Sequence, residues 1–282
     1  MKFENVRVFN FEGALRGMRN PKNSWHLSDS TFGICHISTF CEDILPEYIY
    51  LWHPELINDN SPEAQDRYDE LFDEVLNNNL IFSQDSICEY ANIGPKDMKL
   101  AQTLIAGGSE HRKFMRQIFV SVDITAPLYW WKEADTYKVG TVANSTSTMH
   151  KLASKPITLD CFEIDDYDAD VVERLNDPQL VSISGIIDLL ETLRQKYLET
   201  NDKKYWKELV RWLPESWLQT RTMTLNYETL AAIYHQRKNH KLNEWSGKDD
   251  NRLSNFMRFI NNLPYSKDLI QFAEDSKNET NS

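Results

Sequence analysis

The stretch from Gly107 to His150 limits the possible folds most, because it carries the signals of several consecutive elements. After a Gly-Gly pair, the run Phe114–Ile124 places apolar side chains at alternate positions, which is typical of a strand. Pro127 then precedes the aromatic sequence LYWWKEADTYK, whose apolar residues recur at helical spacing. A segment rich in hydroxyl groups begins at Thr141. The stretch therefore predicts a strand, a helix and a polar loop, in that order.

The charge of this stretch differs from that of the whole chain. It contains five Lys or Arg residues and four Asp or Glu residues, whereas the 282-residue chain has a formal net charge of −12. Nucleic acids and anionic membranes require a basic surface, so we expect neither as a partner. A small anionic ligand needs only a local positive potential, and this stretch could provide one.

The rest of the chain predicts an α+β fold, with a central mixed or antiparallel sheet flanked by long helices. Residues 1–12 alternate apolar and polar side chains and predict a first strand. Helices are predicted over residues 61–80, 96–106, 183–197, 204–212, 222–239 and about 252–262. Ser61 is expected to cap the first of these helices. The residues expected to face inward in the helix 183–197 are Ile186, Leu189, Leu190 and Leu193.

The chain shows no internal repeat and no low-complexity linker. The simplest organisation is one domain over residues 1–272 and a flexible tail over residues 273–282. Between the first strand and the later elements, the segment Leu15–Asp29 predicts a loop because Gly17 and Pro21 interrupt any regular pattern. Arg16 and Arg19 of this loop are either solvated or face a phosphate or a cofactor.

The cysteines and the N-terminus bear on the cellular compartment. The four cysteines are scattered and form no CxxC pair, so we expect no zinc ribbon and no other metal site. The first residues contain no apolar leader, and no window approaches about 18 continuous apolar residues. We therefore expect a cytoplasmic protein with reduced thiols and no membrane span.

Two groups of polar residues are candidate ligand sites, since the chain contains no GxSxG, HExxH, P-loop or Rossmann motif. The first group surrounds the predicted strand and aromatic helix and consists of Glu110, His111, Lys138, Thr141, Asn144, Ser147 and His150. The second belongs to the predicted helix 222–239 and its end, and consists of Asn226, His235, Arg237 and His240. Such donors suit a phosphate group or the edge of a pyrimidine ring. Taken alone, each group is also what a helix cap or an exposed helix face would show.

Two segments of the chain resemble the flavin-dependent thymidylate synthases, the ThyX family. In residues 107–150, Glu110-His111 precede a strand, an aromatic helix and a polar motif, as in that family. The sequence LPESWLQTRTMTLNYETLAAIYHQRKNHKLNEW is similar to the family's segment with Leu-Pro, Thr, Asn-x-x-x-Leu and Arg. Thr136-Tyr137-Lys138 stand where the family has Arg-His-Arg, so only Lys138 keeps the positive charge. Thr125-Ala126 stand where the family has Ser-Arg.

The resemblance implies roles for particular residues. The side chains implied to bind the flavin cofactor FAD are those of Glu110, His111, Lys138, Asn144, Asn226 and Arg237. Those implied to bind the substrate are Thr141, Ser147 and His150, with Arg16 and Arg19 as replacements for the family's missing arginines. The family transfers a one-carbon unit from methylenetetrahydrofolate to dUMP with NADPH as reductant, and it forms homotetramers.

Two alternatives stay open, because this chain lacks arginines that the family has. A guanidinium binds phosphate through two hydrogen bonds, whereas the ammonium of Lys138 is a point charge. The chain could be a non-catalytic homologue that binds a nucleotide or a partner protein. It could also be a related pyrimidine-modifying enzyme with a different substrate. In that case Trp130, Trp131 and Tyr137 would either supply a stacking surface or simply pack in the core.

Overall fold

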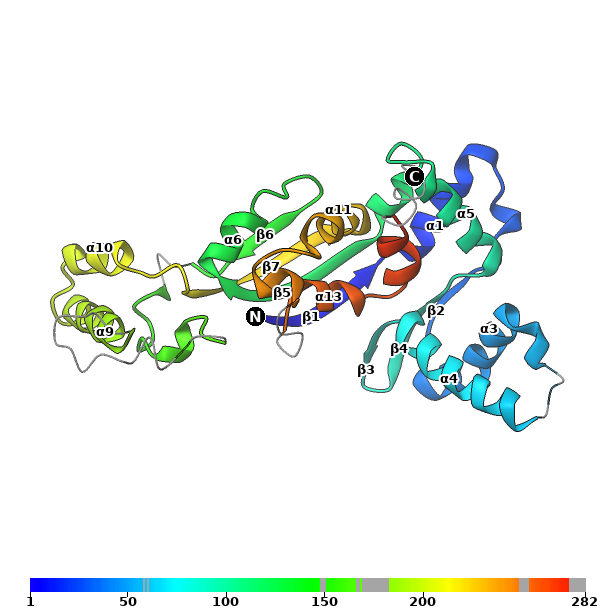
Figure 1. The fold of residues 1–282 in the computed structure, drawn as a ribbon, viewed down its shortest axis with the longest axis horizontal. Coiled ribbons are helices and arrows are strands. Elements are labelled where there is room, and N and C mark those ends of the chain that lie inside the picture. The colour runs from blue at the N-terminus through cyan, green and yellow to red at the C-terminus, as the bar shows by residue number, and fades with distance from the viewer. Residues whose placement is uncertain are drawn as a thin grey trace.

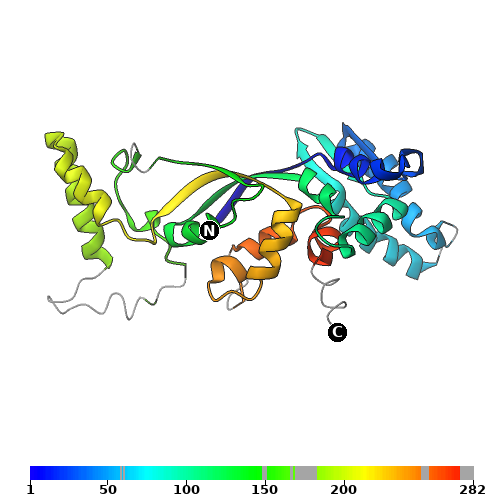
Figure 2. The same ribbon diagram turned by 90° about the horizontal axis from the view of Figure 1, so that it is seen from above.

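The computed structural model describes residues 1–57, 59, 61–147, 151–165, 168, 183–248 and 254–273. Two antiparallel sheets and the helices around them form an elongated molecule (Figures 1 and 2). The four-stranded sheet consists, in spatial order, of β1 (Lys2–Phe9), β5 (Phe119–Pro127), β7 (Leu218–Asn226) and β6 (Val142–Ser145). The three-stranded sheet consists of β2 (Thr31–His36), β4 (Ile87–Asn92) and β3 (Leu80–Gln84). The predicted α+β class with an antiparallel central sheet is confirmed.

The four-stranded sheet has one apolar face and one polar face. Along β5, the side chains of Val120, Val122 and Ile124 are fully buried, whereas Ser121 and Asp123 between them are partly exposed. Helices α11 (Tyr227–Arg237) and α13 (Phe256–Asn261) lie on one side of this sheet in Figure 2. The period of two along β5 therefore sets which face is covered.

Helix α6 (Leu128–Ala134) follows β5 directly, as the aromatic sequence predicted. Its Trp130 and Trp131 belong to the main apolar core, where Trp130 stacks on Trp245 with 4.5 Å between ring centres. Both tryptophans are at most 1% exposed. The alternative in which they offer a stacking surface to a ligand is therefore wrong, because neither ring is accessible.

The three-stranded sheet has its own apolar cluster with helices α3 (Leu45–Trp52) and α4 (Pro62–Asn79). Ser61 caps α4 as predicted, since its hydroxyl oxygen accepts the backbone N–H of Ala64 at 3.2 Å. The hairpin of β3 and β4 was not predicted from the sequence. Helix α5 (Pro95–Ala106) then leads back to the central sheet and ends at the Gly-Gly pair, as predicted.

A third apolar cluster lies at the opposite end of the molecule (Figure 1), between α9 (Ile183–Thr200) and α10 (Lys203–Arg211). Leu190 and Leu209 are fully buried there. Leu189 was predicted to face inward, but its side chain is 48% exposed. The helix presents Ile186, Leu190 and Leu193 to α10, and Leu189 lies outside this narrower stripe.

The pH dependence of stability should include a contribution from Glu191 in α9. Its carboxylate accepts hydrogen bonds from Arg194 at 2.6 and 2.7 Å and from the Ile157 backbone N–H at 2.9 Å. The hydrogen bonds from Arg194 are the main reason that the pKa of Glu191 is lowered to about 2. The stabilisation is complete above the unfolded-state pKa near 4.5 and is lost as the pH falls towards 2. We expect Glu191→Gln to reduce the free energy of unfolding by about 1–2 kcal/mol at pH 7 and by much less near pH 2. Urea titrations at the two pH values measure this difference, and an equal effect at both would contradict the assignment.

Four predicted elements differ in the structure. The predicted loop 15–29 begins inside helix α1 (Phe11–Arg19), and the first part of the predicted strand 114–124 is a 3₁₀ turn, Lys113–Gln117. The predicted loop after Gly140 contains strand β6. The prediction of a helix over residues 222–239 is wrong for the first five residues, which belong to β7. There the buried side chains of Met223 and Leu225 alternate with less buried threonines, as in a strand.

The remaining expectations concern the chain ends and membranes. Of the predicted helix 252–262, residues 256–261 are helical, and residues 252–253 lie outside the described part of the chain. In the predicted tail, Ala273 is buried and residues 274–282 lie outside the described part. Among the helices that the structure describes, none combines the length and the apolar character needed to cross a bilayer.

Candidate functional site

The structure brings the two segments that resemble the ThyX family into direct contact. Strand β6, after the aromatic helix, pairs with β7 from Val142 opposite Thr224 to Ser145 opposite Arg221. The turn between α6 and β6 lies against α11, which continues from β7. Residues that are about 85 to 100 positions apart in sequence therefore form one polar region around the Tyr137–Thr141 loop.

Asn226 connects this loop to the start of α11. It is the last residue of β7 and the N-cap of α11, with its side-chain oxygen accepting the Thr229 backbone N–H at 2.9 Å. The Thr229 hydroxyl donates to the Val139 carbonyl at 2.9 Å. Asn226 is 5% exposed, and its Nδ2 has no hydrogen-bond acceptor among the described residues. The amide oxygen of Asn226 thus caps α11, and its amide nitrogen is a donor that no described residue uses.

Gly140 allows the loop to approach Asn226 closely. Its φ is +72°, and a Cβ at this position would lie 2.3 Å from Asn226 Nδ2 and 3.3 Å from the Thr229 hydroxyl. Such a distance is well inside van der Waals contact, and a positive φ is itself unfavourable for a side chain. Glycine is therefore required here on two counts.

Replacing Gly140 by alanine should lower the free energy of unfolding by about 1–3 kcal/mol. Gly108 is the matched control, since its φ is +95° but a Cβ there would meet nothing within 4 Å. Gly108→Ala shares the backbone strain without the clash, so it should cost less in the same urea titration. Equal losses for the two variants would show that the contact with Asn226 is not tight.

Arg237 forms the second connection between α11 and the loop. Its Nε donates to the Tyr137 hydroxyl at 2.8 Å, and its Nη1 donates to Glu133 Oε2 at 2.7 Å. The guanidinium also lies over the Trp245 ring, 5.0 Å from the ring centre. Tyr137 in turn donates to Gln236 Oε1 at 2.9 Å. These contacts fix the position of Arg237.

Glu133 was not singled out from the sequence, although it is a central acceptor of this region. Besides Arg237, its Oε2 accepts the indole N–H of Trp245 at 3.1 Å and lies 3.4 Å from His240 Nε2. Glu133 lies in the last turn of α6 and Tyr137 lies three residues beyond its end, and both contact Arg237. Arg237, Trp245 and His240 follow Glu133 by more than 100 positions in the sequence, so only the folded structure shows that they meet at this carboxylate.

Arg221 was also missed. It lies on β7 opposite Ser145, its Nη1 donates to Asp135 at 2.7 Å, and its guanidinium lies 4.2 Å from the centre of the Trp131 ring. A helix was predicted over residues 222–239, and no strand was predicted over residues 218–221, which begin β7. An alternating pattern read over residues 218–226 would have placed Arg221 on the helix-covered face of the sheet.

Four other predicted residues of the first group lie on the Tyr137–Thr141 loop or along the strand that follows it. Lys138 is exposed on the loop itself, and Thr141 donates its hydroxyl to the Tyr137 carbonyl. Asn144 is exposed on β6 opposite Thr222, and Ser147 follows that strand and is half-buried. His150 lies outside the described residues.

Glu110 and His111 lie in the turn between α5 and the 3₁₀ turn and are exposed. Glu110 forms an ion pair with Lys113 at 3.4 Å. The neighbouring Arg112 is buried and forms an ion pair at 2.8 Å with Glu228 in the first turn of α11. This pair attaches the turn to the same helix that holds Asn226 and Arg237.

The two arginines of the predicted N-terminal loop lie on α1. Arg19 is 5% exposed, and its Nε donates to Asp97 at 2.5 Å, which favours a structural role over a ligand contact. Arg16 is exposed, with its guanidinium 5.9 Å from the centre of the Trp25 ring. In the described part of the chain, no group of three or more His, Cys, Asp or Glu side chains could hold a metal ion.

Comparison with known proteins gives a structural likeness but no sequence match. No protein-family profile and no curated protein matches this chain. A structure of the flavin-dependent thymidylate synthase ThyX from Helicobacter pylori complexed with FAD and dUMP is 13% identical, with a TM-score of 0.42 over 86% of this chain and 96% of that chain. A second structure of that enzyme, also with FAD and dUMP, gives 13% and 0.42 over 87% and 98%. Values this low transfer no ligand or activity to this chain.

Proposed function

We propose that this chain is an enzyme of the flavin-dependent thymidylate synthase type. It binds FAD and a pyrimidine deoxynucleotide beside the Tyr137–Thr141 loop and α11, and it transfers a one-carbon unit from methylenetetrahydrofolate to dUMP, with NADPH as reductant. The observation that carries the proposal is the convergence of the two sequence segments that resemble the family on one polar region, through the β6–β7 pairing and the contacts of Asn226 and Arg237.

The donors of this region fit a nucleotide or a flavin. The side chain of Asn226 is 5% exposed, and its N–H₂ group donates to no described residue, so this donor suits a carbonyl at the edge of a flavin or pyrimidine ring. Lys138 is exposed on the adjacent loop and supplies a positive charge for a phosphate. Arg237 is held by Glu133 and Tyr137, which presents its guanidinium in a fixed orientation. When bound, reduced flavin supplies the redox chemistry for the one-carbon transfer.

The roles proposed for the other residues are more peripheral. Thr141, Asn144 and Ser147 lie along the strand that leaves the loop and would contact the substrate or flavin from that side. Glu110 and His111 would reach the same region through the turn attached by Arg112 to α11. A homotetramer stays a prediction, and light scattering of the purified protein measures it.

The test begins with the purified protein. We expect it to take up added FAD, with quenching of flavin fluorescence, and to show a raised Tm when dUMP is added. Release of tritium from 5-labelled dUMP, with methylenetetrahydrofolate and NADPH present, then tests the proposed reaction. Binding of both ligands without tritium release would exclude this reaction and favour a different pyrimidine reaction or a non-catalytic homologue. No binding of either ligand would contradict the proposal altogether.

Lys138→Ala should weaken dUMP binding about tenfold or more, since one charge-assisted contact with a phosphate contributes about 1.5–3 kcal/mol. Lys132→Ala is the matched control, because Lys132 is also exposed but forms its ion pair with Glu215 at 2.5 Å. The control should leave dUMP affinity unchanged. If the two variants bind dUMP equally well, Lys138 does not contact the nucleotide.

A further inference from the structure

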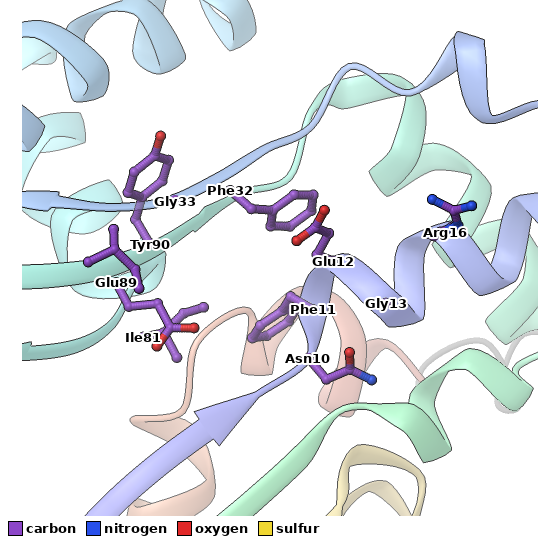
Figure 3. Close-up of a pocket in the computed structure, with 11 residues that line it drawn as sticks. Asn10, Phe11, Glu12, Gly13, Arg16, Phe32, Gly33, Ile81, Glu89 and Tyr90 are labelled. Atoms are coloured by element: carbon purple, nitrogen blue, oxygen red, sulfur yellow. The ribbon is translucent and has the colours of Figure 1, made fainter.

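A cavity lies away from the proposed flavin site, between the first turn of α1 and the three-stranded sheet (Figure 3). Its volume is about 540 Å³, which is within the range of small-molecule sites. Strands β2, β3 and β4 form one wall of this cavity, and residues 10–13 and Arg16 of α1 with its N-cap form the other. No residue of the Tyr137–Thr141 loop or of α11 borders it.

The aromatic walls of this cavity are held in place by packing. Phe11 is 1% exposed and lies edge-on to Tyr227 and Tyr265, with ring centres 5.6 and 5.7 Å away. On the opposite wall, a Cβ on Gly33 would lie only 2.9 Å from the Tyr90 hydroxyl and 3.0 Å from its ring, so only glycine lets the ring lie there. Phe32, the next residue, is half-buried and borders the same space. The cavity therefore has a preformed aromatic lining.

The charged groups of the cavity are mainly acidic. Glu12 has no ion-pair or hydrogen-bond partner among the residues that the structure describes, whereas Glu89 forms an ion pair with Arg7 at 4.0 Å. Arg16 is the one cation among the lining residues, and Figure 3 shows it beyond Gly13, at the end away from Glu89. Glu12 is therefore the carboxylate of this cavity that is left to pair with a ligand, and it lies beside aromatic side chains. A carboxylate in such a place favours a positively charged ligand.

We propose that this cavity binds an organic cation, an amine or amidinium with an aromatic or aliphatic body. The cationic group would lie against Glu12, and the apolar body would pack on Phe32 and Tyr90. A cation gains both from a carboxylate partner and from the face of an aromatic ring. Among the lining residues, Arg16 is one that the resemblance also assigns to the substrate, but the cation would not contact it, so the proposal does not depend on the function proposed above.

Calorimetric titration of the full chain with phenethylammonium, and with its neutral analogue 2-phenylethanol, tests this proposal. We expect the cation to bind at least ten times more tightly than the alcohol, with affinity that falls as salt is added. Equal affinities, or no measurable binding of the cation, would overturn the proposal.

Variants assign the binding to this cavity. Glu12→Gln should weaken binding of phenethylammonium at least fivefold, whereas Phe32→Ala should weaken binding of both probes. Glu47→Gln, at an exposed carboxylate of α3 away from the cavity, should change neither. Arg16→Gln should leave the affinity for the cation unchanged or raise it. A cation affinity that is unaltered in Glu12→Gln, or lowered equally in Glu47→Gln, would show that the probe binds elsewhere.

Discussion

Replacement of Asp97 by alanine is expected to lower the free energy of unfolding by about 3–5 kcal/mol. The Asp97 side chain is fully buried, and it accepts hydrogen bonds from Arg19 Nε at 2.5 Å and from the hydroxyls of Ser28 and Ser30 at 2.5 and 2.6 Å. Without this carboxylate, the buried guanidinium of Arg19 keeps its charge and loses its partner. An uncompensated buried charge is among the most destabilising defects in a folded protein.

The double replacement of Arg19 by Met and Asp97 by Ala is the control for this prediction. It removes both charges, so it should cost clearly less than the sum of the two single replacements. Urea titration followed by circular dichroism measures all three variants. A loss below about 1 kcal/mol for Asp97→Ala, or strict additivity in the double variant, would contradict a buried ion pair between α1 and α5.

Replacement of Trp130 by alanine should also cost about 3–5 kcal/mol, because it removes the centre of an aromatic cluster. Trp130 is fully buried and contacts Trp131, Trp245 and Phe256, with ring centres 4.8, 4.5 and 5.6 Å away. Its indole N–H has no hydrogen-bond partner among the described residues. Trp130→Phe therefore loses packing but no hydrogen bond, and it should cost less than the alanine variant.

Trp212 provides the comparison for this tryptophan, since its side chain is 58% exposed. Trp212→Ala should change the free energy of unfolding by less than about 1 kcal/mol. Thermal unfolding in the absence of any ligand separates the variants. If Trp130→Ala were as stable as Trp212→Ala, the ring could not be part of the core.

The sequence was sufficient for elements whose signals are local. The cap at Ser61, the apolar face of α4 and the helix after Pro127 are each specified by neighbouring residues, and the structure shows all three. The sequence was insufficient where contacts between distant segments decide the secondary structure. Thr222 to Asn226 were predicted to be helical together with the residues that follow them. Instead, pairing with β5 on one side and β6 on the other keeps them extended.

The candidate site was predictable in its residue types but not in its geometry. Asn226 was expected on a helix face with Thr229, whereas it caps that helix and lies against Gly140. Glu133 and Arg221 were missed because their importance comes from contacts across about 86 to 112 positions of sequence. Arg19 was expected in a loop, and only the structure shows Asp97 beside it.

Titration of FAD into the wild-type chain and two Asn226 variants shows whether Asn226 and the loop beside it bind a flavin. Asn226→Asp keeps the oxygen that caps α11 but removes the N–H₂ donor, whereas Asn226→Ala also removes the cap and should cost about 1 kcal/mol of stability. We predict that wild-type protein binds FAD, and that Asn226→Asp binds it at least tenfold more weakly with an unchanged Tm. Failure of the wild-type protein to bind FAD, or equal binding by Asn226→Asp, would contradict the account.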